Sequence, residues 1–391
     1  MSPETLHLRY GMNPHQGAAA LSSSEGDLPI KVLNGAPGFI NLLDALNSWQ
    51  LAIELKRAVG LPSASCFKHV SPVGAAVASP LSDTLRKAWF VGSQELSPLA
   101  TAYVRARGAD RVSAYGDFAA LSDTVDVSTA RVLRREVSDA VIAPGYEPEA
   151  LEILSGKKGG RYLIIEADPD FEPAEVESRD VFGMRMEQQR DSRIPSMDDL
   201  ANVVTATQVL PDSAKIDMLV SMVALKYTQS NSVCLAIDGQ IIGMGAGQQS
   251  RIHCTRLAAS KAETWWLRQH PNVMSLEFPR GTGRPDRDNA IDQFLSDDLT
   301  DEEETAMGST FTSPPSRLSS EAKREWIGEL TGVTLGSDAF IPFRDNIDRA
   351  AKTGVKYVVQ AGNSLRDADV ITACDQYGMA MVFNGVRLFH H

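Results

Sequence analysis

The chain has 391 residues, enough for two or three packed units with sizeable cores. Its hydrophobic fraction of 43% and charged fraction of 23% are those of an ordinary globular protein, and no apolar run approaches the ~18 residues of a membrane span. The formal net charge of −12 argues against a general nucleic-acid binder, so an anionic ligand would need a local cluster of arginine or lysine.

The cysteines and the N-terminus indicate the compartment. Cys66, Cys234, Cys254 and Cys374 are scattered without a CxxC pattern, and the N-terminus lacks a signal-peptide pattern. Reduced thiols in a cytoplasmic protein are the simplest interpretation.

The N-terminal region predicts an arm followed by a helix. Residues 6–20 combine aromatic, basic and amide side chains without periodicity, so we expect an ordered arm rather than a regular element or a loose tail. Residues 30–33 predict a short strand, and the apolar spacing of residues 40–59 predicts an amphipathic helix. Asn41 lies at the start of that helix, where a helix-capping role is the simplest interpretation.

An adjacent lysine and histidine follow the next predicted strand. Residues 64–67 form that strand, and Lys68 and His69 stand at its end before a Ser-Pro and glycine turn. Open α/β sheets bind ligands at the carboxyl ends of their strands. A lone histidine is more often structural, but the paired lysine leaves the catalytic and structural interpretations evenly balanced.

The middle of the chain alternates predicted helices and strands. In order these are helices near 81–89 and 98–107 (the latter polar), strands at 112–115 and 137–144, a helix at 146–155, a strand at 162–167 and a helix at 213–225. Asp139 interrupts an otherwise buried strand and would need a partner if enclosed. Residues 168–195 are expected to be a connection, and residues 278–320 a surface insertion.

The most informative stretch covers residues 225–256. Five hydrogen-bonding side chains, at 228–232, precede a predicted hairpin over 233–244 with Asp238-Gly239 at its turn. A Gly-Ala-Gly turn then opens a predicted helix over 248–266. Backbone N–H groups at such a start suit an anion or a carbonyl oxygen, although the glycine turn alone is more often an ordinary cap. We interpret this stretch as the floor of a binding site.

The last third predicts a helix at 321–330 and strands at 355–359 and 379–384. Chain ends usually fray. Because the final residues, 387–391, are rich in arginine, phenylalanine and histidine, we expect them to be docked.

The two halves of the chain predict an internal repeat. Residues 67–69 are echoed by 225–227, and residues 117–126 by 338–348. We therefore expect two related α/β units, 1–200 and 201–391. Their equivalent loops would face one cleft and bring Lys68 and His69 to Asn231.

Motif absences narrow the chemistry. There is no HxE, CxxC or HExxH for zinc, no GxxxxGK[ST], no GxGxxG between strand and helix, and no GxSxG. What remains is the Lys-His pair, amide and hydroxyl donors, and Arg9, Arg251 and Arg387. This set suits group transfer between two bound organic substrates, one or both of them anionic.

The chain resembles the formyltransferase portion of the bifunctional purine enzymes of the AICAR transformylase/IMP cyclohydrolase (PurH) family. The resemblance is ordered and covers nearly the whole chain, failing mainly near 168–200 and 278–320. It rests on RYGMNPHQ, NGAPGFINLLDALN, FKHVSPVGAAV, SAYGDFAALSD, REVSDAVIAPGYE, KYTQSNSV, GAGQQSRIHCTRLA, DAFIPFRDNIDRA and RLFHH. Because Met1 lies just before RYG, we expect no cyclohydrolase activity here and a separate IMP cyclohydrolase downstream.

The resemblance implies formyl transfer from 10-formyltetrahydrofolate to the 5-amino group of AICAR, giving FAICAR and tetrahydrofolate. His69 would accept the proton, Lys68 would stabilise the transition state or assist the leaving nitrogen, and Asn231 would align the reacting groups.

The resemblance also assigns ligand contacts. Those to AICAR are Arg9, Tyr10, Asn41, Gly116, Asp139, Arg251, Phe340 and Arg387. Those to the folate are Ile252, Asp345, Ser364 and Leu365. A structural potassium ion would be held by oxygens of Leu225, Thr228, Ser230, Ser232, Asp338 and Leu388.

The family further implies cytidine-deaminase-like halves without zinc and a homodimer with shared active sites, into which residues 6–20 would reach from the neighbour. Two alternative functions compete with formyl transfer. A non-catalytic AICAR- and folate-binding regulatory homologue would be favoured by loss of Lys68, His69 or Asn231, and all three are present. A deaminase of the related fold fails on the missing metal ligands.

Overall fold

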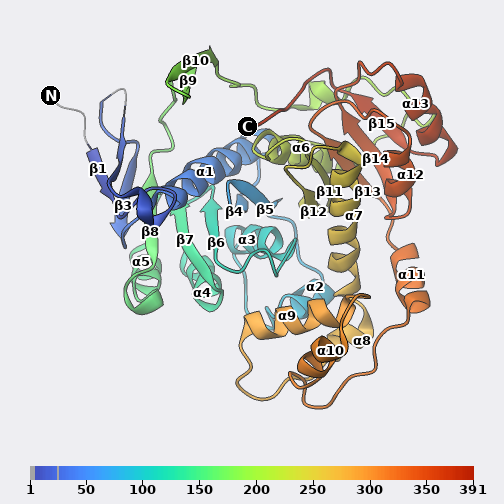
Figure 1. Cartoon of the computed structure of the whole chain (residues 1–391), viewed down its shortest axis with the longest axis horizontal. Coiled ribbons are helices and arrows are strands. Elements are labelled where there is room, and N and C mark those ends of the chain that lie inside the picture. The colour runs from blue at the N-terminus through green and yellow to red at the C-terminus, as the bar shows by residue number, and fades with distance from the viewer. Residues whose placement is uncertain (1–4, 24–25) are drawn as a thin grey trace.

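The computed structural model describes residues 5–23 and 26–391, so residues 1–4 and 24–25 of the expected first unit lie outside it (Figure 1). Within the described residues, one mixed sheet of 11 strands crosses the molecule. In sheet order its strands are β15 (Ala380–Phe383), β14 (Val355–Gln360), β13 (Val333–Ser337), β11 (Val233–Ile237), β12 (Gln240–Gly245), β5 (Ser71–Val77), β4 (Ser63–Lys68), β6 (Asp117–Leu121), β7 (Ser138–Ala143), β8 (Leu163–Ala167) and β3 (Ile30–Asn34).

Helices cover both faces of this sheet, which confirms the predicted α/β class. One face carries α1 (Phe39–Val59) and α6 (Asp212–Lys226). The other carries α2 (Asp83–Ala88), α3 (Pro98–Gly108), α4 (Val127–Arg135), α5 (Pro148–Ser155), α7 (Arg251–Leu267), α12 (Asp345–Ala351) and α13 (Asp367–Gln376). Enclosure on two sides explains why the central strands are continuously apolar rather than alternating.

The two halves of the sheet pair their strands in one order. In β5-β4-β6-β7-β8 and in β12-β11-β13-β14-β15, a hairpin is followed by an antiparallel neighbour and two parallel strands. The halves meet through the antiparallel pair Gln240–Ala76. The expected correspondence of residues 67–69 with residues 225–227 does not follow this strand order, because Lys68 ends a strand whereas Lys226 ends helix α6. That residue-level alignment is wrong.

Glycines allow helices to approach the sheet closely at matching places in the two halves. A Cβ on Gly74 of β5 would lie 2.2 Å from the Ala106 carbonyl oxygen of α3. A Cβ on Gly243 of β12 would lie 2.1 Å from the Ala258 carbonyl oxygen of α7. Any side chain at either position would push its helix off the strand.

Three predictions for local structure need correction. The strand expected at 112–115 is a turn, because the Asp110 carboxylate accepts hydrogen bonds from the Ser113 N–H and hydroxyl, and the strand begins at Asp117. The arm at 6–20 contains regular structure, since β1 (Thr5–Leu8) pairs with β2 (Ala19–Ser22). The helix expected to be polar at 98–107 is largely buried, with Arg105 and Arg107 enclosed.

The expected surface insertion at 278–320 is also corrected, because it is part of a small packed lobe (Figure 1). The lobe contains α8 (Pro271–Met274), α9 (Arg284–Leu295), α10 (Asp301–Gly308) and α11 (Ser320–Gly328). Phe294 and Phe311 lie in its own apolar core. The acidic and glycine-rich surface of this segment hid the apolar positions of α9.

The connection at 168–195 carries a protruding hairpin. Strands β9 (Val176–Val181) and β10 (Met184–Gln189) pair only with each other, and every residue in them is exposed. Phe182 at the turn is 97% exposed. Among the described residues, no helix is both long and apolar enough to cross a membrane, and the four cysteines are buried without forming a disulfide.

A buried aspartate at the β11–β12 turn is expected to make the unfolding free energy depend on pH. Asp217 of α6 is buried, and its Oδ1 accepts a hydrogen bond from the Gly239 N–H at 2.6 Å. Burial, reinforced by the charge of Asp238, raises the pKa of Asp217 from 3.8 to about 7. The native state therefore holds a proton that the unfolded chain has released, so stability present below about pH 4 is lost as the pH rises through about 7.

The Asp217→Asn variant keeps an acceptor oxygen for Gly239 but does not titrate. Relative to this variant, we expect the unfolding free energy of the wild type to fall by on the order of 4 kcal/mol between pH 4 and pH 8. Urea denaturation at each pH measures the difference. A difference that stays constant across this range would contradict the prediction.

Candidate active site

Strand directions place the predicted site residues at one edge of the sheet. β4, β13, β14 and β15 end there, whereas β6, β7 and β11 begin there. His69 and Asn231 share this edge, but β5 and β12 lie between their strands. Three strand spacings correspond to about 14 Å. The structure thus places both residues at one edge but on strands that are not neighbours, so the edge carries two clusters.

The first, the Lys–His cluster, consists of Asp44, Lys68, His69, Tyr115 and Asp139. Lys68 ends β4, and its Nζ donates a hydrogen bond to the Tyr115 carbonyl at 2.7 Å. His69 is the first residue of the two-residue β4–β5 turn and is exposed. The turn thus presents an imidazole to solvent beside an anchored ammonium group.

Asp44 is a member of this cluster that the sequence interpretation missed. It lies on α1, one turn after Asn41, and is only 7% exposed. Its Oδ1 accepts a hydrogen bond from the Val70 N–H at 2.7 Å, and the His69 N–H also faces the carboxylate. Burial raises the pKa of Asp44, while these N–H groups and the nearby imidazole oppose the rise. The signal for Asp44 in the sequence was an aspartate among the apolar residues of the helix predicted over 40–59.

Two expected AICAR contacts face each other beside this cluster. Gly116 has φ +77°, and a Cβ there would lie 3.7 Å from Asp139 Oδ2. Asp139 is exposed at the start of β7 and pairs with Lys158. The predicted need for a partner is met by Lys158, although Asp139 is not enclosed.

Arg9 and Asn41 meet at the start of α1. A Cβ on Gly38 would lie 3.6 Å from Arg9 Nη2, and the Asn41 Oδ1 accepts a hydrogen bond from the Gly38 N–H at 2.9 Å. The capping role expected for Asn41 is therefore confirmed. The Arg9 guanidinium also lies 5.6 Å from the centre of the Tyr10 ring.

The second cluster, the Asn231 cluster, consists of Asn231, Ser232, Arg251, Ser337 and Asp338. Arg251 begins α7 and is 7% exposed; its Nη2 donates to Asn231 Oδ1 at 2.8 Å, and its Nη1 to Ser337 Oγ at 3.0 Å and to Asp338. The fully buried Asp338 accepts from the Ser232 N–H at 2.8 Å and from its hydroxyl at 3.1 Å. Arg251 thereby fixes the Asn231 carboxamide.

The C-terminal residues support this second cluster, which confirms that they are docked. The Ser230 N–H donates to the His390 carbonyl at 3.0 Å, and the His390 N–H donates to Ser230 Oγ at 3.1 Å. The Leu388 N–H donates to the Asp338 carbonyl at 2.7 Å. The loop before β11 is therefore held by residues about 160 positions further along the chain.

The expected folate contacts lie on the same side of the edge as the Asn231 cluster. Ile252 is in the first turn of α7 and Asp345 begins α12, and these helices are joined by a hydrogen bond of 2.7 Å from Thr255 Oγ1 to Asn346 Oδ1. Ser364 and Leu365 lie in the loop after β14, with Leu365 fully exposed.

Two expected AICAR contacts complete this side of the edge. Phe340 follows Asp338 and is 44% exposed. The Arg387 guanidinium lies 4.8 Å from the centre of the Phe389 ring.

The expected potassium ligands form an all-oxygen set, the kind that hard cations prefer. Asp338 is hydrogen-bonded to both Ser232 and Leu388, Ser230 is bonded to His390, and Leu225 and Thr228 lie at the end of α6. Thr228 Oγ1 donates to the Ala224 carbonyl at 2.7 Å, which leaves its lone pairs available. In the described part of the chain, no group of three or more histidine, cysteine, aspartate or glutamate residues is placed to hold a metal ion.

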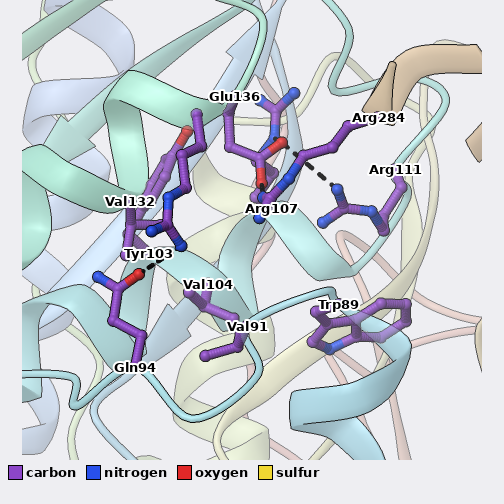
Figure 2. Close-up of a pocket in the computed structure, with 11 residues that line it drawn as sticks. Trp89, Val91, Gln94, Tyr103, Val104, Arg107, Arg111, Val132, Glu136 and Arg284 are labelled. Atoms are coloured by element: carbon purple, nitrogen blue, oxygen red, sulfur yellow. Dashed lines mark hydrogen bonds and ion pairs between the residues drawn. The ribbon is translucent and has the colours of Figure 1, made fainter. Parts of the chain in front are cut away.

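A buried ion network supports the turn that anchors Lys68. Figure 2 shows Glu136 among the guanidinium groups of Arg107, Arg111 and Arg284. Burial disfavours the charged form of Glu136, but the three arginines together lower its pKa to about 2. Arg111 also reaches Asp288 of α9 at 2.8 Å.

A cavity of about 320 Å³ beside this network is lined by Tyr115, whose carbonyl holds Lys68. The small lobe therefore braces the first cluster through residues 110–116. No local pattern in the sequence signals this network, because its members lie up to 177 positions apart.

Comparison with known proteins places these features in context. The family described as AICARFT/IMPCHase bienzyme matches residues 2–261. The chain is 31% identical over 388 residues to the bifunctional purine biosynthesis protein PurH of Roseobacter denitrificans, covering 98% of this chain and 59% of that protein. It is 32% identical over 395 residues to that of Xanthomonas euvesicatoria, covering 99% of this chain and 58% of that protein. The chain thus spans less than two thirds of these relatives.

Proposed function

The chain belongs to the AICARFT/IMPCHase bienzyme family, and we propose that it transfers a formyl group from 10-formyltetrahydrofolate to the 5-amino group of AICAR. The products are FAICAR and tetrahydrofolate. The observation that carries the proposal is the exposed His69 beside the anchored Lys68.

The chemistry explains why such groups are needed. The 5-amino group of AICAR is a weak nucleophile because its lone pair is conjugated with the ring and the carboxamide. His69 takes the proton of this amine as it attacks, and the formyl carbon becomes tetrahedral. Lys68 stabilises the developing negative oxygen or assists the departing nitrogen of the folate. Asn231, held by Arg251, aligns the formyl group with the amine.

We propose a homodimer in which each site combines the first cluster of one chain with the second cluster of its partner. Two observations support it: the clusters are about three strand spacings, or ~14 Å, apart on one chain, and the β9–β10 hairpin exposes apolar side chains. A two-stranded hairpin is marginally stable on its own. Sedimentation equilibrium should give twice the 42.4 kDa chain mass; a monomer at assay concentration would contradict the shared site.

The test is the absorbance change on tetrahydrofolate release when the purified 391-residue chain is mixed with AICAR and 10-formyltetrahydrofolate. We expect FAICAR as the accumulating product; accumulation of IMP would contradict a monofunctional assignment for this polypeptide. The melting temperature of the protein is also measured in potassium and in sodium buffers. A lower melting temperature in sodium would support the proposed ion site. Binding of AICAR without turnover would instead favour a regulatory binding protein.

A further inference from the structure

We propose that Asp44 is a positioning residue for His69, because its buried carboxylate holds the turn from which the imidazole projects. The inference rests on the proposed function for the role of His69. The contact between Asp44 and the His69–Val70 turn, which we call the hold, is a property of the fold. It can therefore be tested without any substrate.

The His69–Val70 turn has a backbone that its own residues disfavour. His69 has φ +55° and Val70 has φ +58°, so both positions of the two-residue turn lie in the left-handed region. Turns of this kind prefer asparagine, aspartate and glycine. A β-branched valine in this region is a true outlier, and such conformations persist only where surrounding contacts impose them.

Asp44 supplies that contact from the neighbouring helix. Its Oδ1 is 2.7 Å from the Val70 nitrogen, and its carboxylate also faces the His69 N–H. Both positions of the turn are therefore tied through their backbone to one buried side chain of α1. The charge of Asp139 also acts on the Asp44 carboxylate and helps to raise its pKa.

The β11–β12 turn, in the second half of the sheet, can be compared directly with the β4–β5 turn. Asp217 of α6 binds the Gly239 N–H at the β11–β12 turn, in the same arrangement as Asp44 of α1 at the β4–β5 turn. That turn also has positive φ values, +53° at Asp238 and +77° at Gly239, but Asp-Gly is a favoured pair there. It also lies at the opposite edge of the sheet. Of these two turns, therefore, only the one at His69 must be imposed by its surroundings.

The variants Asp44→Ala and Asp217→Ala remove the same carboxylate from the two turns. We expect Asp44→Ala to lower kcat about 100-fold with KM for AICAR changed less than about threefold, because a misplaced catalytic group costs turnover more than binding. Asp217→Ala should leave kcat within about twofold. Adding Val70→Gly to Asp44→Ala lets the turn form unaided and should recover about tenfold in kcat.

Hydrogen exchange of residues 66–72 measures the hold without substrate. Exchange in this segment should speed up in Asp44→Ala and stay unchanged in Asp217→Ala. Unchanged exchange in Asp44→Ala, equal losses of kcat in the two alanine variants, or no recovery with Val70→Gly would each overturn the inference. Faster exchange together with an inactive wild type would instead support the hold and reject the proposed function, so the two failures are distinguishable.

Discussion

Replacing His69 with alanine is expected to lower kcat for formyl transfer by about 10²–10⁴-fold, the usual contribution of a positioned general base. KM for AICAR should change little, because the role proposed for His69 is to accept the amine proton as it leaves rather than to bind the nucleotide. Initial rates of tetrahydrofolate release measure both constants. Added imidazole should restore part of the lost rate, since the missing group is a proton acceptor.

The matched control is His270→Asn. His270 caps α8 by accepting a hydrogen bond from the Asn272 N–H at 3.1 Å, and asparagine keeps a side-chain oxygen for that bond. His270 lies in the small lobe, away from the site edge, so this variant should retain full activity. If His69→Ala kept more than about a tenth of the wild-type kcat, the assignment of His69 as the base would be wrong.

The Asp338→Ala variant should have the largest effect on stability. Asp338 is fully buried and holds Arg251 together with the N–H and hydroxyl of Ser232. Removing it leaves the buried Arg251 charge without its partner, which costs about 3–5 kcal/mol. Urea denaturation measures the unfolding free energy. The Asn231 carboxamide should also lose its fixed position, because Arg251 is no longer anchored.

Asp369→Ala is the appropriate comparison. Asp369 pairs with Arg366 one helical turn away, and the two side chains are 59% and 57% exposed. Exposed pairs contribute ~0.2–1 kcal/mol at most, so this variant should be nearly neutral. Similar losses of stability in Asp338→Ala and Asp369→Ala would show that the buried network is not a main support of the fold.

Local patterns in the sequence were enough to predict most regular elements. The apolar spacing of residues 40–59 predicted α1, and Asp238-Gly239 between two apolar runs predicted the β11–β12 hairpin. The prediction failed where a side chain overrode the pattern. Apolar Val112 and Tyr115 suggested a strand, but Asp110 stabilises a turn there. The pairing of β1 with β2 spans a loop with no hairpin signal.

The candidate site was predictable only in residues that stand at the ends of helices and strands. Lys68, His69, Asn231 and Arg251 stand at element ends, where residue type alone suggests chemistry. The groups that hold them are set by distant contacts. Tyr115 binds Lys68 through its carbonyl, so its side-chain identity carries no signal. Asp44 and Glu136 are buried carboxylates whose partners only the assembled sheet brings near.

The docking of the last residues onto the loop before β11 imposes an order on biosynthesis. The groups bonded directly to Lys68 and to the His69–Val70 turn are the Tyr115 carbonyl and the Asp44 carboxylate, so these bonds can form early on the growing chain, before the small lobe that braces residues 110–116. Ser230 and Asp338, in contrast, are bonded to His390 and Leu388. On the growing chain the His69 turn can therefore bond to α1 long before the loop that carries Asn231 acquires its bonds to His390, because those bonds need the final residues.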